Sequence, residues 1–364
     1  MELAGVVVVE DGGADAPQIS PVLATHQVAN RPIAHHVIDA LEAAGVERIV
    51  VASSSESAST VHQCVATRPA LDRAQLQFVH QDGPLELGSA LRLVAPIVND
   101  APCIVHIAGG LLAEPLSALV ESLDGGPDAV LMVHQAAPPD QRLSRSTQSL
   151  LHLAELDPSR SALGIAGVWG FGPGGLRSVV GGRQPGAINH VPPGGPSRVA
   201  PIDLTALADR IAFGGGMLRV RLVDVWRSYR GDANDLLELN RLVLDQIEAD
   251  PPHGGADGNR IEGRVRVHER ASVKSTVIVG PVVIGPDARI SDAYIGPYTA
   301  IGAGAHIEGA EIERSIISAG ASVTHIGSRM TASIVGPNAR LFRDFSLPRA
   351  LRVRIGDGAE VGLC

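Results

Sequence analysis

The feature that most constrains the fold is a short apolar period in the last third of the chain. From Ile261 onward an aliphatic residue recurs every five or six positions. The series is Ile261, Val267, Val273, Val279, Ile284, Ile290, Ile295, Ile301, Ile307, Ile312, Ile317 and Val323. Each face of a triangular coil takes about six residues with one inward aliphatic, a period that neither a helix nor an ordinary hairpin sheet has. The pattern predicts a left-handed parallel β-helix, a hexapeptide solenoid, over residues 261–364.

Residues 1 to about 240 have a different pattern, in which short apolar runs alternate with helical spacing. Strands are expected at 3–9, 48–52, 76–79, 103–107 and 129–133, and helices at 32–44, 86–95, 115–123 and 235–247. This alternation predicts an α/β fold with a mostly parallel sheet covered on both faces. Ligands of such sheets bind beyond the carboxyl ends of the strands, so the loops after Val9 and Ile107 are where we expect a site.

The two patterns predict two domains joined by a linker. The expected divisions are an α/β domain at 1–248, a linker rich in Pro, Gly and Asp at 249–260, and the solenoid at 261–364. The 364 residues are 45% hydrophobic, which suffices for two cores, whereas a net charge of −9 and 3% aromatic residues argue against a nucleic-acid partner.

The predicted location is the cytoplasm, without a membrane partner. The N-terminal residues lack a basic segment typical of signal peptides, and the longest apolar runs are too short to span a bilayer. The cysteines, Cys64, Cys103 and Cys364, match no zinc or redox spacing and are expected to be reduced thiols.

Several motifs resemble those of one enzyme family. The strongest match is VW at 225–226 followed by GDANDLLELNR at 231–241, and a second is IVGPVVIG at 278–285. Shorter matches are VANRP at 28–32, Gln81-Asp82 with Pro84-Leu85, and Gly167-Val168. In these motifs the chain resembles the long-form glucose-1-phosphate thymidylyltransferases, which are sugar-1-phosphate nucleotidyltransferases. The resemblance implies a Rossmann-like transferase domain followed by a left-handed β-helix used in oligomer contacts, and hence a homo-oligomer, dimer or tetramer.

The cationic groups of that family are absent from the matching positions. Its phosphate loop, G-G-x-G-T-R-L, corresponds here to EDGGADAP, in which Gly12 and Gly13 remain, Glu10 and Asp11 add carboxylates, and the arginine is missing. Lys274 is the only lysine and lies in the predicted solenoid, so neither lysine that the family uses is present. Carboxylates at this loop would repel a triphosphate.

The metal-binding groups of the family are absent as well. Its G-D-N motif aligns with Ala108-Gly109-Gly110, and the aspartate of W-K-D-T-G-N aligns with Ser228. Nucleotidyl transfer depends on positioning and on charge neutralisation by a metal and cations. The sequence therefore predicts no metal, no cofactor and a divergent member that has lost this reaction.

New acid/base groups stand on or beside the loops that form the family's active site. The candidate catalytic residues are Glu10, Asp11, His26, Glu86, His106 and Asp224. A histidine near carboxylates can act as an acid or base at neutral pH. The alternative for each carboxylate is a solvated loop group, and for His106 a hydrogen-bonded core group. The candidate substrate-binding residues are Gly12, Gly13, Gln81, Gly109, Gly110 and Trp226, where Gln81 matches a family residue that contacts the base.

Three functions remain open at this point. The first is a metal-independent acid/base or shape-directed reaction on a small biosynthetic intermediate of secondary metabolism, bound in the former sugar-nucleotide cleft. The second is a non-catalytic paralogue that binds or regulates an active nucleotidyltransferase, and the third is a thymidylyltransferase with displaced metal ligands. Acyl transfer by a solenoid histidine, His268, His306 or His325, is a weaker alternative because the long acyl-CoA-binding extension is missing.

Overall fold

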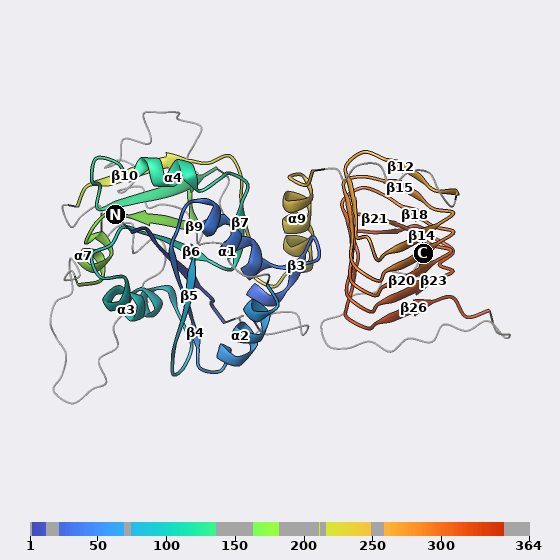
Figure 1. The fold of residues 1–364 in the computed structure, drawn as a ribbon, viewed down its shortest axis with the longest axis horizontal. Helices are drawn as coiled ribbons and strands as arrows, with labels where there is room; N and C mark the ends of the chain where they lie inside the picture. Colours follow the sequence, from blue (N-terminus) through green and yellow to red (C-terminus); the bar gives the residue numbers. More distant parts are fainter. Residues whose placement is uncertain are drawn as a thin grey trace. The chain divides into compact units, whose positions relative to one another are not determined.

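The computed structural model describes residues 2–11, 22–68, 74–135, 163–181, 211, 216–248 and 258–345. Contacts between residues divide the chain into two compact units. Unit 1 comprises 1–11, 22–25 and 33–228, and unit 2 comprises 12–21, 26–32 and 229–364. Figure 1 colours the chain from the blue strands of unit 1 to the red coils of unit 2. The boundaries predicted at 248 and 261 stay a prediction.

Unit 1 is built on one seven-stranded sheet with the order β10-β8-β9-β6-β1-β4-β5. Its strands are β1 (Ala4–Val8), β4 (Arg48–Ser54), β5 (Gln75–Gln81), β6 (Cys103–Ile107), β8 (Ala129–His134), β9 (Gly164–Phe171) and β10 (Leu218–Leu222). Of these strands only β9 runs antiparallel to its neighbours. The five predicted strands are confirmed to within two residues, and the sheet is the expected mostly parallel, Rossmann-like one.

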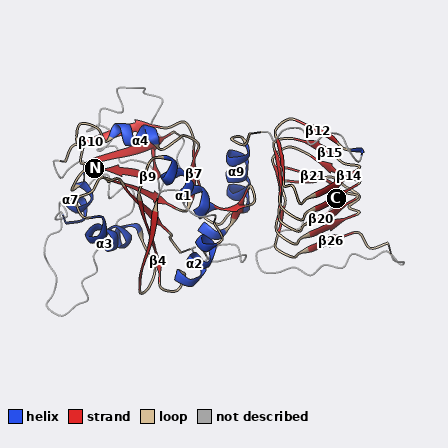
Figure 2. Cartoon of the chain, viewed as in Figure 1, coloured by secondary structure: helices blue, strands red, loops and turns tan. Residues whose placement is uncertain are grey.

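Helices cover both faces of this sheet, as predicted (Figure 2). They are η1 (Leu23–Thr25), α1 (Ile33–Ala43), α2 (Ala58–Ala66), α3 (Leu87–Val98), α4 (Ser117–Ser122) and α7 (Gly175–Gly181). On one face, Gly5 of β1 lies against Leu41 of α1. On the other, Val6 of the same strand shares an apolar cluster with Leu91 of α3 and Leu176 of α7.

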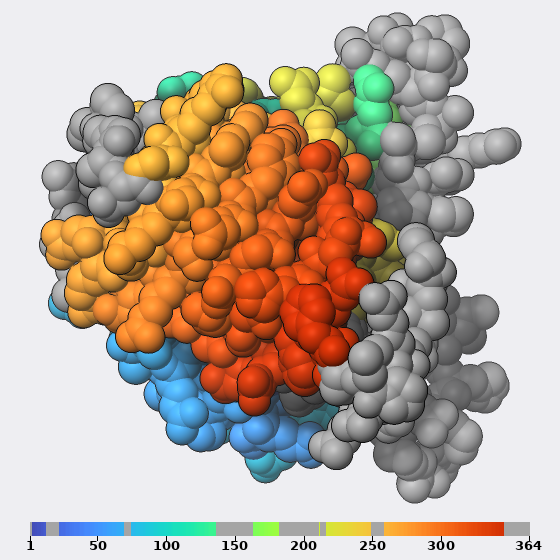
Figure 3. Space-filling view, turned by 90° about the vertical axis from the view of Figure 1, so that its right-hand side faces the viewer, coloured from blue at the N-terminus to red at the C-terminus, as the bar shows by residue number. Residues whose placement is uncertain are grey.

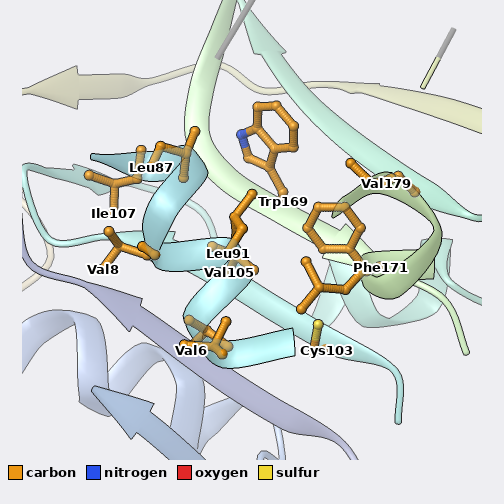
Figure 4. Packing of buried hydrophobic residues seen from close by; sticks show 14 of the residues in the cluster. Val6, Val8, Leu87, Leu91, Cys103, Val105, Ile107, Trp169, Phe171 and Val179 are labelled. Carbon is orange, nitrogen blue, oxygen red and sulfur yellow. The ribbon is translucent and has the colours of Figure 1, made fainter. Parts of the chain in front are cut away.

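The apolar cluster on the α3 side forms the main core of unit 1. Figure 4 shows Val6, Leu91, Val105 and Phe171 packed together there, all of them buried. Between α3, β6 and β9 the side chains leave a gap too small to admit a water molecule. The gap is lined by Leu87, Leu91, Val105, Ile107, Gly167, Trp169 and Phe171. It is part of the packed core and offers no ligand site.

Unit 2 contains the predicted left-handed parallel β-helix, built from three five-stranded parallel sheets. The β12 sheet comprises β12 (Arg260–Glu262), β15 (Val277–Val279), β18 (Tyr294–Ile295), β21 (Glu311–Glu313) and β24 (Met330–Thr331). The β13 sheet comprises β13 (Val265–Val267), β16 (Val282–Ile284), β19 (Thr299–Ile301), β22 (Ile316–Ile317) and β25 (Ile334–Val335). The β14 sheet comprises β14 (Ser272–Lys274), β17 (Arg289–Ser291), β20 (His306–Glu308), β23 (Ser322–Thr324) and β26 (Arg340–Phe342).

The solenoid stacks its coils by pairing equivalent residues. Ile278 pairs with Ile295, and Ile295 with Ile312, so these successive coils are 17 residues apart. Their side chains point inward and are fully buried. The apolar period predicted Ile295 and Ile312 correctly, but it was wrong at Val279, which is half-buried, because its neighbour Ile278 takes the inward position. Figure 3 looks onto the solenoid, where the coils run as bands from orange to red.

A helix and a hairpin also belong to unit 2. They are α9 (Ala233–Leu244), which Asp232 caps by accepting from the Asn234 and Asp235 amides, and the pair β2 (Gln27–Val28) and β3 (Arg31–Pro32). The buried Asn240 amide of α9 accepts from Ala29 N at 2.8 Å and donates to the Tyr298 carbonyl at 3.1 Å. Asn30 Nδ2 donates to the Ile301 carbonyl at 2.6 Å. None of the described helices is long and apolar enough to cross a membrane.

Candidate functional site

The carboxyl ends of β1, β4 and β5 meet at one edge of the sheet, and the side chain of Asp11 joins them. Its Oδ1 accepts a hydrogen bond from Ser54 Oγ at 2.9 Å, and its Oδ2 accepts from the Leu85 amide at 3.4 Å. Ser54 Oγ also lies 2.8 Å from Ser57 Oγ and accepts from the Ser57 amide. The sequence reasoning missed these serines, although the run SSSES directly after a predicted strand is a signal for such a network.

Gln81 and Glu86 lie in the loop between β5 and α3. Gln81 Nε2 donates to the Pro84 carbonyl at 3.0 Å and to Ser89 Oγ at 3.1 Å. Glu86 is the N-cap of α3, where it forms a capping box with Ser89, and its side chain is exposed. The structure thus gives both candidates a local structural role and places them on the same edge as Asp11.

The two positions at which the resemblance expects metal-binding aspartates lie close together. Strands β7 (Gly110–Leu112) and β11 (Trp226–Ser228) form a short antiparallel ladder in which Ser228 lies opposite Gly110, the residue after Gly109. Neither position carries a carboxylate. Within the described residues, no three His, Cys, Asp or Glu side chains come together as metal ligands. Because Mg²⁺ prefers carboxylate oxygens, the residues present do not fit it.

The indole of Trp226 fills the space beside this ladder. A Cβ atom built on Gly110 would lie 2.5 Å from Trp226 Cζ2, and one built on Gly167 of β9 would lie 2.8 Å from the same atom. Trp226 is buried, with 5% of its surface exposed. Gly110 and Gly167 are therefore needed here because only a residue without a side chain leaves room for the ring.

His106 on β6 is a buried member of the same region. Its ring centroid lies 5.8 Å from that of Trp226, its Nδ1 lies 2.9 Å from the Ile107 carbonyl, and only 1% of its surface is exposed. Burial lowers the pKa of His106 from its usual 6.5 to about 4. The imidazole is therefore neutral at pH 7 and hydrogen-bonded to the backbone.

The remaining candidates lie apart from these contacts. Asp224 is exposed, and its amide donates to Glu114 Oε1 at 2.5 Å; Glu10 is half-buried. His26 belongs to unit 2, where it is buried and its Nδ1 is hydrogen-bonded to the Tyr229 hydroxyl. Burial also raises the pKa of Tyr229, with further increases from nearby aspartates. Gly12 and Gly13 lie outside the described residues.

Comparison with known proteins agrees with the motifs. No family model matches the chain. It is 26% identical over 352 residues to a glucose-1-phosphate thymidylyltransferase of Streptomyces antibioticus, covering 92% of this chain and 91% of the relative. It is 27% identical over 339 residues to that of Streptomyces griseus, covering 91% and 90%. This chain is a divergent relative of the glucose-1-phosphate thymidylyltransferases.

Two further comparisons support this relationship and the fold. This chain is 24% identical over 344 residues to the low-salt glycan biosynthesis nucleotidyltransferase Agl11 of Haloferax volcanii, and the match covers 92% of each protein. A crystal structure of a putative glucose-1-phosphate thymidylyltransferase from Bacillus anthracis in complex with sucrose covers 68% of this chain and 98% of its own length, with a TM-score of 0.52 and 12% identity. That similarity confirms the nucleotidyltransferase fold.

Apart from Glu10 and Asp224, the described candidate residues of unit 1 fall into two groups. Gly109, Gly110, Trp226 and His106 form a packed region whose titratable group is neutral and buried. Asp11 and the loop from Gln81 to Glu86 form an exposed edge whose carboxylates are accessible. The carboxylates of the second group can exchange a proton with a bound molecule, because they are exposed to solvent and form hydrogen bonds.

Proposed function

We propose that this thymidylyltransferase relative does not perform metal-dependent nucleotidyl transfer. The observation that carries the proposal is the β7–β11 ladder, where Gly109, Gly110 and Ser228 stand in place of the family's metal-binding motifs. The Trp226 indole packs directly against Gly110. Loss of a single group that stabilises the transition state reduces the rate by about two to three orders of magnitude, so the joint loss removes the reaction.

In its place we propose a metal-independent acid/base reaction on a small intermediate of secondary metabolism. Its site is the edge formed by the carboxyl ends of β1, β4 and β5. The carboxylate of Asp11 is the group that accepts a proton from the bound molecule and returns one, so no co-reactant is required. Its accessibility and its hydrogen bond from Ser54 Oγ support this role. The buried His106 holds the strand and takes no part in proton transfer.

The loss of nucleotidyl transfer is tested by incubating the protein with dTTP, Mg²⁺ and glucose-1-phosphate and measuring pyrophosphate. We expect no release above the protein-free background, with an active thymidylyltransferase as the positive control. Turnover at ordinary rates would overturn the proposal and favour a thymidylyltransferase with displaced metal ligands.

The role of Asp11 is tested by deleting the gene and measuring the product of its biosynthetic pathway. We expect the wild-type gene and an Asp124→Asn control, which changes an exposed carboxylate after α4, to restore the product. Asp11→Asn keeps one of the two accepting oxygens but cannot act as a base, so it should fail to restore the product. Full restoration by Asp11→Asn would instead favour the non-catalytic paralogue, which binds or regulates an active nucleotidyltransferase.

A further inference from the structure

Strands β8 and β10 end beside each other at one end of the unit 1 sheet. Both run parallel to β1, so their carboxyl ends lie on the edge at which ligands of such sheets bind. Strands β6 and β9 separate them from β1. The reaction proposed above uses the carboxyl ends of β1, β4 and β5, so it does not involve this part of the edge.

The side chain of His134, the last residue of β8, contains a polar atom without a hydrogen-bond partner. Only 7% of the residue surface is exposed, and Nδ1 lies 3.0 Å from the Gln135 carbonyl. Because a carbonyl only accepts, Nδ1 carries the proton and Nε2 of the neutral imidazole is an acceptor. Nε2 is buried and receives no hydrogen bond from the described residues. An unpaired buried acceptor is unfavourable, so this atom points to a donor on a ligand.

His134 and Arg221 lie on the same face of the sheet. Val133 and Val220, the residues before them, belong to the apolar cluster on the α3 side. Since side chains alternate along a strand, the residue after each valine points to the opposite face. Arg221 pairs with Met132, two residues before His134, so the two side chains are diagonal neighbours. The Nε atom of Arg221 is buried and also has no hydrogen-bond partner among the described residues.

Arg227 of β11 supplies a second guanidinium close to His134. Burial lowers the pKa of His134 below its usual 6.5, and the positive charge of Arg227 lowers it further, so the imidazole is neutral at pH 7. Arg227 is exposed, and neither it nor Arg221 forms an ion pair with any described residue. The guanidinium of Arg219, by contrast, donates to two backbone carbonyls at the end of α4. The guanidinium groups of Arg221 and Arg227 are therefore available to a ligand.

The charges around these groups suit a ligand with one negative charge. A guanidinium binds the two oxygens of a carboxylate through parallel hydrogen bonds. Asp224 lies between the two arginines in the sequence, and its amide donates to Glu114 Oε1, so two carboxylates offset part of the positive charge. A phosphate monoester, with a charge of about −1.5 to −2 at pH 7, would be bound less well. The arginines would repel an ammonium group, so the donor to Nε2 is a hydroxyl.

We propose that the carboxyl ends of β8 and β10 form a binding site for a small hydroxylated carboxylate. The carboxylate pairs with Arg227 and Arg221, and a hydroxyl group of the same molecule donates a hydrogen bond to His134 Nε2. The resemblance to the thymidylyltransferases assigns no role to any of these three residues. The proposal does not depend on the reaction at Asp11.

The first test measures which small molecules the full chain binds. D-Gluconate is the main probe, and calorimetry should give a Kd of about 1 mM or lower. Glycolate and acetate differ by one hydroxyl group, and in competition with gluconate glycolate should bind about fivefold more tightly than acetate. Glucose has hydroxyl groups but no carboxylate, and glucose-1-phosphate has a phosphate instead, so each should bind at least about tenfold more weakly than gluconate.

Three variants connect binding to the named side chains. Arg227→Gln should raise the Kd values of gluconate and glycolate at least about tenfold, because both contain the carboxylate. His134→Phe removes the acceptor and should abolish the preference for glycolate over acetate while leaving acetate binding unchanged. Arg92→Gln removes an exposed arginine of α3, on the opposite face of the sheet, and is the matched control that should bind gluconate as the wild type does.

Several outcomes would contradict the proposed site. Gluconate that does not bind below about 10 mM, or glycolate that binds no better than acetate, would overturn it. Tighter binding of glucose-1-phosphate than of gluconate would show that the site takes a phosphate ester instead. Equal Kd values for Arg227→Gln and Arg92→Gln would exclude the guanidinium. Circular dichroism shows whether His134→Phe is folded, and Arg227→Gln, at an exposed position, decides the outcome if it is not. None of the variants changes Asp11, so the result is separate from the test of the proposed reaction.

Discussion

The solenoid and the β7–β11 ladder of unit 1 both depend on glycines, but for different reasons. In the solenoid a Cβ on Gly302 would lie 2.6 Å from the backbone nitrogen of Ala319, one coil further along. In unit 1 a Cβ on Gly110 would meet the Trp226 ring, more than a hundred residues away in the sequence. The contact of the solenoid glycine recurs in successive coils, and a period in the sequence predicts it. The second is made once, by one side chain, and leaves no local pattern.

The largest expected effect comes from filling the solenoid contact. Gly302→Ala places a methyl group against the rigid backbone of the next coil, so the free energy of unfolding should fall by about 3 kcal/mol. Gly336→Ala is the matched control, because a Cβ there has no atom within 4 Å. Chemical denaturation of both variants measures the difference. Equal stabilities would show that coil spacing does not depend on glycine at this position.

Filling the unit 1 contact should have a slightly smaller effect, because a side chain can move more easily than a backbone. Gly110→Ala is expected to lower the free energy of unfolding by about 2 kcal/mol, and Trp226→Phe in the same chain should recover part of the loss. A double-mutant cycle from denaturation curves gives the coupling between the two residues. Additive effects would mean that the clash lies with the Arg227 carbonyl, 2.7 Å from the same Cβ, instead of the indole.

The difference between a contact that repeats along the chain and a contact made once explains what the sequence could predict. The solenoid followed from a repeated period, and β6 from the run Cys103–Ile107, because local spacing alone determines both. That Gly109 and Ser228 carry no carboxylate is also readable from the sequence. The meeting of these two positions in one ladder depends on a pairing between distant strands, which no local pattern encodes.

The electrostatic environment of single residues was the least predictable part. The alternation of strands and helices places both His106 and Asp11 near strand ends, and both were candidates for acid/base chemistry. The structure separates them, since His106 lies inside the sheet with its pKa near 4 while Asp11 is exposed and bonded to Ser54. Burial depends on helices and strands packed from elsewhere in the chain, so it could not be read from the neighbouring sequence.

The burial of His106 predicts a pH dependence of stability in unit 1. Its pKa is about 4 in the folded chain and near 6.5 when unfolded, so between these values the unfolded chain binds more protons. Stability is complete above pH 6.5 and is lost as the pH falls toward 4. We expect a loss of about 2 kcal/mol between about pH 7.5 and about pH 4.5.

A substitution isolates this contribution from other titrating groups. His106→Gln should reduce the change in unfolding free energy between the two pH values, whereas His80→Gln, at an exposed position of β5, should not. Denaturation curves at both pH values, recorded for the wild type and the two variants, give the comparison. The same slope in all three proteins would show that His106 is accessible to protons in the folded chain.

The smallest expected change in unfolding free energy is at the exposed edge around Asp11, where the contacts are hydrogen bonds and not close packing. Ser54→Ala removes the donor to Asp11 and the acceptor of the buried Ser57 amide, which should cost about 1 kcal/mol of unfolding free energy. Ser55→Ala, which removes the exposed contact to Asp82, is the control and should cost less. If Ser54→Ala and Ser55→Ala lowered the unfolding free energy equally, water would be replacing the lost hydrogen-bond partners of Ser54. The edge would then be more accessible to solvent than the packed region around Trp226. A larger loss would instead place the Asp11 network among the packed contacts of unit 1.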